Sequence, residues 1–163
     1  MRKIARLVVH ASGHDPSSSI GAVDLDAIHK AFGDSGIPYH LVILTDGSIE
    51  RGIPDATIGR HSERYNDDSL AVCLVGGRHP SDEIGGVKKL WPSYLDVQLG
   101  ALKRVLQSWS AQHSGAKPYG ISDLEPDRTQ MPGFDVPLWY RGGGLVPTLT
   151  TASPYVTDPT NES

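Results

Sequence analysis

Short apolar runs separated by turn signals dominate the first half of the chain. Residues 4–9 are mostly apolar and rich in β-branched side chains, which is typical of a strand buried on both faces. Residues 39–44 and 70–75 have the same character. Asp46-Gly47 precedes a further run at 49–53, and this dipeptide accepts the positive φ angles of a tight hairpin turn. The pattern therefore predicts four strands, two of which form a hairpin.

Apolar residues at helical spacing indicate two longer segments. In residues 23–32 acidic side chains fall in the first turn, where the helix dipole favours them. Residues 94–113 carry an apolar stripe, formed by Leu95, Leu99, Leu102, Val105, Leu106 and Trp109. Residues 135–141 are predicted as a short helix or a turn, because Pro137 interrupts them. Strands interleaved with helices indicate an α/β fold with a central mixed β-sheet flanked by helices.

The composition changes at residue 142. Residues 142–163 contain no basic residue and are rich in Thr, Pro and Ser, so they cannot build a core of their own. We therefore predict one folded domain over residues 1–141 and a C-terminal tail over residues 142–163. Within the tail, residues 145–156 are suited to adding a strand to a neighbouring sheet.

Charge and composition narrow the class of protein. The 163 residues have a formal net charge of −4, and the 15 Lys and Arg residues are scattered, which argues against nucleic acid as a partner. Arg6 and His10 interrupt the apolar N-terminus, so we expect no signal peptide. No apolar stretch approaches the roughly 20 residues of a membrane span, and Cys73 is expected to be a buried, inert thiol. These features predict a soluble protein made in a reducing compartment.

Four segments of this chain resemble the zinc-dependent N-acetylmuramoyl-L-alanine amidase family, which includes phage amidase-type lysozymes and peptidoglycan recognition proteins. They are VVHAS at residues 8–12, IPYHLVI with the following Asp-Gly at 37–47, GRHS through CLVGG at 59–77, and the loop at 120–135. The order and spacing of the segments match the family from residue 4 to residue 141. The resemblance implies the amidase fold.

The resemblance also implies a zinc chemistry. A catalytic zinc takes three protein ligands and keeps a fourth position open for water, which it acidifies. By resemblance, His10 holds the first ligand position and Tyr39 matches the family's active-site tyrosine. The other two ligands and a catalytic lysine belong to the loop at 120–135.

That loop departs from the family's pattern. Family members read Gly-His-Ser-Asp-x-x-Pro-x-Arg-Lys-x-Asp-Pro-Gly, and this chain reads GISDLEPDRTQMPG at 120–133. Ile121 therefore replaces the ligand histidine, Met131 replaces the ligand aspartate or cysteine, and Thr129 replaces the lysine. An isoleucine has no donor atom, and a thioether is too soft and uncharged for zinc at such a site. We expect no metal, and we expect Tyr39 to be vestigial.

Other histidines offer one route to a rebuilt site. His61 lies in a segment that borders the family's cleft and could approach His10, with a carboxylate such as Asp123 as a third ligand. His40 follows Tyr39 on a strand, so its side chain should point to the opposite face. His14 and His29 have no ligand spacing, and His79 and His113 are predicted at the surface. The cleft itself should be lined by His61, Asn66, Asp123 and Arg128, and Asn66 with Ser69 should fix the loop ahead of the strand at 70–75.

Two functional hypotheses remain open. In the first, the chain is a catalytically degenerate, phage-encoded amidase-fold protein and not an enzyme. It then either binds peptidoglycan without cutting it or docks on other virion proteins through residues 142–163. In the second, the chain is an endolysin that cleaves the muramoyl–L-alanine amide bond with a rearranged zinc site. The replaced ligands favour the first hypothesis. We expect the protein to be made in the host cytoplasm and, as a virion component, to enter the phage particle.

Overall fold

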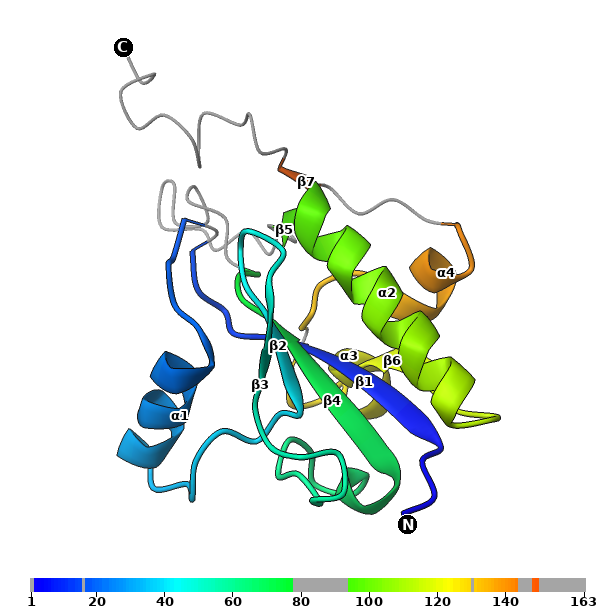
Figure 1. Ribbon diagram of the computed structural model, residues 1–163, viewed down its shortest axis with the longest axis horizontal. Coiled ribbons are helices and arrows are strands. Elements are labelled where there is room, and N and C mark those ends of the chain that lie inside the picture. Colours follow the sequence, from blue (N-terminus) through cyan, green and yellow to red (C-terminus); the bar gives the residue numbers. More distant parts are fainter. Residues whose placement is uncertain (1, 16, 78–93, 130, 144–147, 150–163) are drawn as a thin grey trace.

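The computed structural model describes residues 2–15, 17–77, 94–129, 131–143 and 148–149. At its centre lies a five-stranded sheet with the strand order β3-β2-β4-β1-β6 (Figure 1). These strands are Arg6–Ala11 (β1), Leu41–Ile43 (β2), Ile49–Arg51 (β3), Ser69–Leu74 (β4) and Lys117–Gly120 (β6). A second sheet pairs Tyr94–Leu95 (β5) with Thr148–Leu149 (β7).

The central sheet is mixed, as the sequence predicts. β1 lies between β4 and β6 and runs parallel to both, and β2 runs parallel to β4. β3 is antiparallel to β2 and follows it through the predicted hairpin, in which Gly47 has a φ of 85°. All six residues of β4 and the middle four of β1 are buried, which explains why their sequences read as continuous apolar runs.

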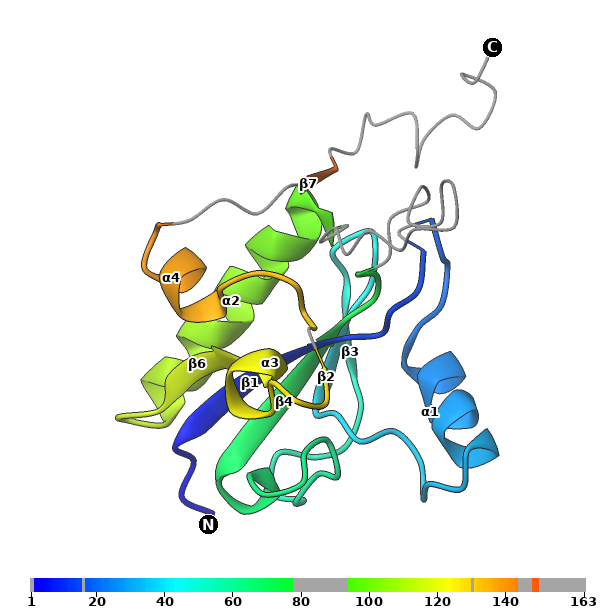
Figure 2. The ribbon, with the colours of Figure 1, turned by 180° about the vertical axis from the view of Figure 1, so that it is seen from behind.

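Helices cover the two faces of the sheet. They are Ala22–Ala31 (α1), Asp96–Gln112 (α2), Ile121–Leu124 (α3) and Val136–Tyr140 (α4), with a 3-10 turn at Asn66–Asp68 (η1). α2 packs on one face with Leu7 and Val9 of β1 and with Leu70 and Val72 of β4. The α1 side holds a smaller cluster that includes Tyr39 and Cys73. Figures 1 and 2 show α2 and α1 on different sides of the strands.

Several predicted bounds need correction. The first strand begins at Arg6 and continues to Ala11, because its ladder with β4 runs over these six residues. The second strand is limited to Leu41–Ile43 by its pairing with β4 and β3. The helix predicted over 94–113 begins at Asp96, since Tyr94 and Leu95 form β5.

The short segment with Pro137 is a helix, α4. Pro137 stands in its first turn, where a backbone N–H has no partner within the helix, so the missing donor costs nothing. The Asp135 side chain caps the helix by accepting a hydrogen bond of 3.0 Å from the backbone N–H of Leu138. The alternative of a bare turn is therefore excluded.

Four residues of the C-terminal tail are described, namely Gly142 and Gly143 after α4 and Thr148 and Leu149 in β7. Thr148 and Leu149 of β7 pair with Tyr94 and Leu95 of the same chain, so this part of the predicted strand-adding segment binds within its own chain. Residues 144–147 and 150–163, as well as His79, lie outside the described residues. Docking of the tail on other proteins stays a prediction. Among the described helices, none has the length and apolar character that a bilayer crossing requires.

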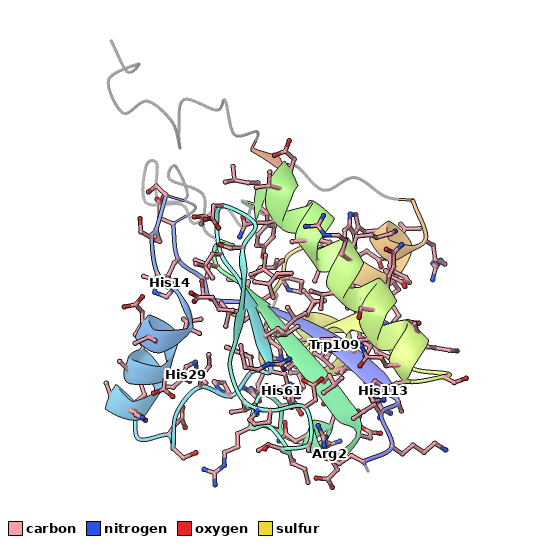
Figure 3. All side chains as sticks on the ribbon, in the orientation of Figure 1. Arg2, His14, His29, His61, Trp109 and His113 are labelled. Carbon is pink, nitrogen blue, oxygen red and sulfur yellow. The ribbon has the colours of Figure 1, made fainter. Side chains whose placement is uncertain are left out.

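Arg2 ties the N-terminus to two loops. Its guanidinium donates hydrogen bonds to the backbone carbonyls of Asp55 and Thr57 in one loop, at 2.7 and 3.2 Å. It also donates to the carbonyls of Asn66, Asp67 and Ser69 in the other, at 3.1 to 3.3 Å. Figure 3 shows Arg2 near the start of the chain, where these loops meet. The Arg2 side chain thus connects the segment before β1 with the segment before β4.

Gln98 is a buried polar residue that joins α2 to the sheet. Its Oε1 accepts a hydrogen bond of 3.0 Å from the backbone N–H of Leu95, and its Nε2 donates one of 2.8 Å to the carbonyl of Val75. Its side chain is 0% exposed. Both amide atoms are therefore used, and the first contact also satisfies a free N–H at the start of the helix.

We predict that Gln98→Ala lowers the free energy of unfolding by about 2–3 kcal/mol, because it leaves two buried backbone groups without partners and opens a cavity. The measurement is urea denaturation followed by circular dichroism. Gln107→Ala is the matched control, since Gln107 is exposed on the same helix. Equal stability of the two variants would contradict this account of Gln98.

Candidate functional site

His10 lies near the C-terminal end of β1, on the face of the sheet turned away from α2. It aligns with Cys73 of β4 across the parallel ladder, and Cys73 belongs to the cluster on the α1 side. The ring of His10 packs against the ring of Tyr39, with 5.0 Å between the ring centroids. The alternation of side chains along β1 therefore places His10 and Tyr39 together, as the sequence analysis expects of the family's active site.

A chain of buried hydrogen bonds extends from His10. Its Nε2 lies 2.9 Å from Nδ1 of His61, and Nε2 of His61 lies 2.8 Å from Oγ of Ser69. Ser69 in turn donates a hydrogen bond of 2.6 Å to the backbone carbonyl of Tyr65. The three side chains are 6%, 4% and 0% exposed. The expected approach of His61 to His10 is confirmed, and Ser69 joins it as a residue that the sequence indicated only as a loop support.

Burial keeps both imidazoles neutral. It lowers the pKa of His10 well below the ordinary value, and the charges of His61 and Arg128 act in the same direction. Burial likewise lowers the pKa of His61 to about 3, helped by the charges of His40 and Arg2. Because a depressed histidine pKa means that the folded protein disfavours the cation, neither ring carries a charge near neutral pH.

Tyr39 also lies between His29 and Cys73. Its ring meets the ring of His29 edge to face at 5.7 Å. The pKa of Tyr39 is raised well above the ordinary value, first by burial and then by the neighbouring Cys73. Burial also raises the pKa of the Cys73 thiol, which is free and buried as predicted. Neither group ionises readily, so neither is a nucleophile at neutral pH. The position of His29 beside Tyr39 was not foreseen from its spacing.

The fold brings the three ligand positions of the resemblance together. Val9 pairs with Gly120 at the end of β6. Because the two strands are parallel, the next residues, His10 and Ile121, lie at the same level. The backbone N–H of Ser122 donates a hydrogen bond of 2.9 Å to the carbonyl of Met131. The Met131 side chain then lies over the ends of the first and fourth strands, close to the Cα atoms of Gly13 and Gly77.

These residues do not fit a zinc ion. His10 is the only one of the three residues with a donor atom that zinc prefers. Ile121 is 3% exposed and has no donor atom, and Met131 supplies a thioether alone. Over the described residues, no group of three His, Cys, Asp or Glu side chains is arranged to hold a metal. The donor chemistry therefore disagrees with the metal that the resemblance implies.

Asp123, Thr129 and Asn66 have local hydrogen-bonding partners. The Asp123 carboxylate accepts a hydrogen bond of 2.8 Å from the backbone N–H of Gly120 at the start of α3, so it is directed to its own helix. The Thr129 hydroxyl oxygen accepts from the N–H of Met131 at 3.0 Å. The Asn66 side chain accepts from the N–H of His61 and Ser62, at 3.1 and 3.0 Å, which agrees with its predicted role in fixing the loop.

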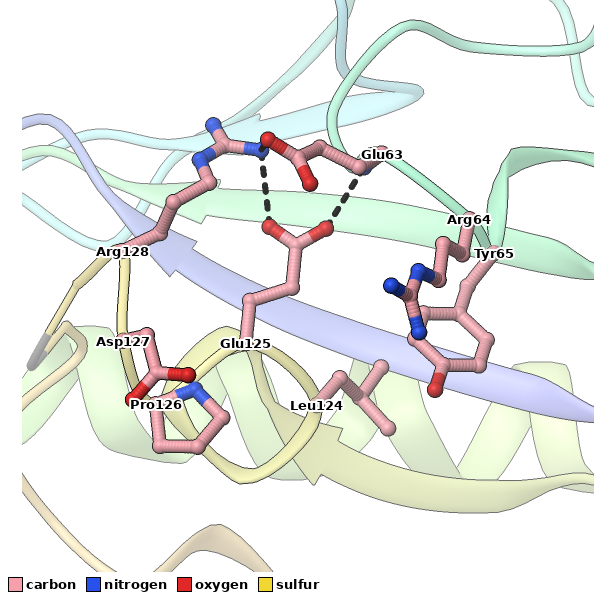
Figure 4. Close-up of a pocket in the computed structure, with 8 residues that line it drawn as sticks. All are labelled: Glu63, Arg64, Tyr65, Leu124, Glu125, Pro126, Asp127 and Arg128. Carbon is pink, nitrogen blue, oxygen red and sulfur yellow. Dashed lines mark hydrogen bonds and ion pairs between the residues drawn. The ribbon is translucent and has the colours of Figure 1, made fainter.

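Arg128 is part of an ionic clasp between two loops (Figure 4). The Glu125 carboxylate accepts hydrogen bonds from Nη1 of Arg128 at 2.8 Å and from the backbone N–H of Glu63 at 2.5 Å. Arg128 also lies 3.9 Å from the carboxylate of Glu63. The Glu125 side chain is 8% exposed, whereas that of Arg128 is 50% exposed. Arg128 was predicted from the sequence as a residue of the site, whereas its two carboxylate partners, Glu63 and Glu125, were not.

The clasp borders a pocket with charges of both signs. Its volume is about 160 Å³, and its lining residues are Glu63, Arg64, Tyr65, Leu124, Glu125, Pro126, Asp127 and Arg128 (Figure 4). The charge of Arg128 acts on the pKa of both His10 and Tyr39. Arg128 therefore connects this pocket electrostatically with the histidine cluster.

The other histidines among the described residues make no hydrogen bond to His10 or His61. His40 uses Nδ1 to accept a hydrogen bond of 3.0 Å from the N–H of Ala71, and its Nε2 lies 2.8 Å from the carbonyl of Thr57. This placement agrees with the expected turn of His40 away from Tyr39. In Figure 3 His14, His29, His61 and His113 lie at separate places in the molecule. Of these rings, only that of His61 is hydrogen-bonded to His10.

Comparison with known proteins identifies the family. A sequence profile described as N-acetylmuramoyl-L-alanine amidase matches residues 1–133. The endolysin of Enterobacteria phage T3 is 31% identical to the chain over 140 residues, which cover 86% of this chain and 87% of that endolysin.

Solved structures show the same fold. The amidase LysC from Clostridium intestinale URNW matches with a TM-score of 0.66 and 23% identity, over 83% of this chain and 80% of that one. Human PGRP-IBETAC, solved in complex with glycosamyl muramyl pentapeptide, matches with a TM-score of 0.60 and 16% identity, over 84% and 85% of the two chains. The predicted amidase-like sheet is thereby confirmed. The chain belongs to the N-acetylmuramoyl-L-alanine amidase family and is similar to phage endolysins.

Proposed function

We propose that this chain binds peptidoglycan in the cleft around His10, Tyr39 and Arg128 without the zinc-dependent hydrolysis of its family. One observation carries the proposal. Val9 pairs with Gly120 ahead of Ile121, and a backbone hydrogen bond joins Ser122 to Met131. The three positions that carry the zinc ligands in the family pattern are therefore occupied in this chain by one imidazole, one aliphatic side chain and one thioether. Zinc hydrolysis needs three donors to hold the metal that acidifies water. The family's fold is therefore kept, whereas two of the three donors that its zinc chemistry needs are replaced.

The position of the family's lysine supports the same conclusion. Thr129 stands there, and its hydroxyl oxygen is engaged by the N–H of Met131. A hydroxyl held in this way carries no positive charge to stabilise an oxyanion. Tyr39, which keeps its family position, is buried against two other side chains and has a raised pKa. It then serves as a wall of the cleft.

Binding, in contrast, does not require a metal, and polar partners for a ligand line the pocket beside Arg128. Arg128 presents a half-exposed guanidinium that Glu125 holds in place, and arginine suits the carboxylates of a peptide stem. The relative PGRP-IBETAC, with the same fold, was solved with a muramyl pentapeptide. A cell-wall peptide is therefore the ligand class that we propose for this chain.

A second candidate function is hydrolysis of the muramoyl–L-alanine bond, as in an endolysin. The observation that favours it is the likeness to the phage T3 endolysin along most of both chains. It requires a metal site assembled from His10, His61 and a third donor. Measuring bound metal and the peptides released from the cell wall distinguishes hydrolysis from binding alone.

The first prediction concerns wall binding. We expect the protein to sediment with purified sacculi, and Arg128→Ala to weaken this binding about tenfold, which corresponds to roughly 1.4 kcal/mol. The physical reason is the loss of the cation that faces the cleft. Arg104→Ala is the control, because Arg104 is exposed on α2, on the other side of the sheet. Absence of wild-type binding would exclude the proposed function.

The second prediction concerns the metal. We expect the wild-type protein, dialysed against zinc, to retain far less than one equivalent by elemental analysis. The triple variant Ile121→His, Thr129→Lys, Met131→Asp should retain about one equivalent, because it adds two donors to His10 and so completes a set of three. It should also release L-alanyl peptides from sacculi in a chelator-sensitive manner. Ile121→Val with Met131→Leu is the matched control. Stoichiometric zinc and hydrolysis in the wild type would establish the second candidate instead.

The third prediction concerns the clasp. Glu125→Ala should speed hydrogen exchange at the Glu63 amide, lower the free energy of unfolding by about 1 kcal/mol and weaken sacculus binding. The reason is that Arg128 and the Glu63 N–H lose their common acceptor. Asp127→Ala is the control, because Asp127 lines the same pocket and makes no hydrogen bond to a described residue. Unchanged exchange at Glu63 would show that the clasp does not hold the loops.

A further inference from the structure

The position of one proton in the histidine chain follows from Ser69. Its hydroxyl has a single proton, which it donates to the carbonyl of Tyr65 at 2.6 Å, because a carbonyl can only accept. The oxygen of Ser69 must therefore accept the contact of 2.8 Å from His61. It follows that Nε2 of His61 carries a proton.

The proton of His10 is located in the same way. A neutral imidazole has one proton, and that of His61 is on Nε2, so Nδ1 of His61 accepts. The atom 2.9 Å away, Nε2 of His10, is then the donor. Since His10 is neutral too, its Nδ1 has no proton. Burial, which disfavours both cations, supports this assignment.

Nothing polar among the described residues uses the lone pair on Nδ1. No described residue donates a hydrogen bond to this atom, and the other two ligand positions of the family pattern carry Ile121 and Met131. In a zinc site, the hydrogen bond on the far nitrogen of a ligand histidine sets the tautomer for the metal. Here that arrangement persists although the other donors are replaced.

We propose that His61 and Ser69 fix the tautomer of His10, so that Nδ1 serves as a permanent hydrogen-bond acceptor for an N–H group of the ligand. The inference rests on the proposed function, in which that group is an amide N–H of a cell-wall peptide. His10 is then a binding residue, and His61 and Ser69 are positioning residues. The ring nitrogen at the family's metal position thus accepts a hydrogen bond from the ligand.

The first test measures the tautomer in the free protein. Two-bond ¹H–¹⁵N correlation spectra at neutral pH should show His10 and His61 as Nε2-protonated tautomers. His61→Leu removes the acceptor, so His10 should become a mixture of tautomers. His61→Asn, which is close to leucine in volume, places an amide oxygen near the former Nδ1 and should keep the Nε2 proton on His10. A proton on Nδ1 of His10 in the wild type would overturn the inference.

The second test measures binding to purified sacculi. In His10→Asn an amide oxygen stands close to the place of Nδ1, whereas His10→Gln keeps the donor toward His61 and loses the acceptor. We expect His10→Asn to bind nearly as the wild type does and His10→Gln to bind about tenfold more weakly. Equal binding by the two variants, or stronger binding by His10→Gln, would contradict the acceptor role of Nδ1.

The two tests separate this inference from the proposed function. If the wild type does not bind sacculi, the proposed function fails together with the ligand-binding role of Nδ1, while the spectra decide on the positioning by His61 and Ser69. If sacculi bind and His10 is protonated on Nδ1, the proposed function stands and the present inference fails. Circular dichroism of each variant confirms that it is folded.

Discussion

The register of β1 between its two parallel neighbours is the constraint on which the site depends. Hydrogen bonds to β4 align His10 with Cys73, and hydrogen bonds to β6 align Val9 with Gly120. A shift by one residue would turn His10 into the apolar layer under α2 and bring Val9 or Ala11 to its place beside Tyr39. The buried apolar residues of β1 oppose such a shift, because they fit the layer under α2. Core packing and the position of His10 are therefore set by the same interaction.

Much of the fold could be predicted because the relevant signals are local. The β-branched runs, the Asp46-Gly47 turn and the apolar stripe of α2 each reflect their own segment. Element ends were less accurate, because pairing with other segments decides them. Tyr94 and Leu95 continue the helical pattern, for example, but pair with residues 148 and 149. The resemblance to the amidases supplied what periodicity could not, namely the topology.

Some residues of the candidate site could also be predicted from the sequence, and others could not. His10, Tyr39 and Arg128 stand in family motifs, and the sequence analysis named them. Glu63, Glu125 and His29 carry no such signal, since exposed-looking carboxylates and a helical histidine occur in every soluble protein. They become informative only when distant loops meet, as at the 2.5 Å contact between the Glu63 amide and Glu125. Ser69 was expected to fix a loop, and its second contact, to His61, depends on how the loop between these two residues folds back.

The anchoring of Arg2 has a practical consequence for handling the protein. Its guanidinium holds five backbone carbonyls from two loops, and one of those loops supplies Ser69 and the turn before it. An affinity tag placed ahead of residue 2 would begin beside these contacts, whereas the site lies at the other end of β1. Tag position is therefore a variable to control in any binding assay, because strain at the N-terminus would reach His61 through the loop that Arg2 fastens.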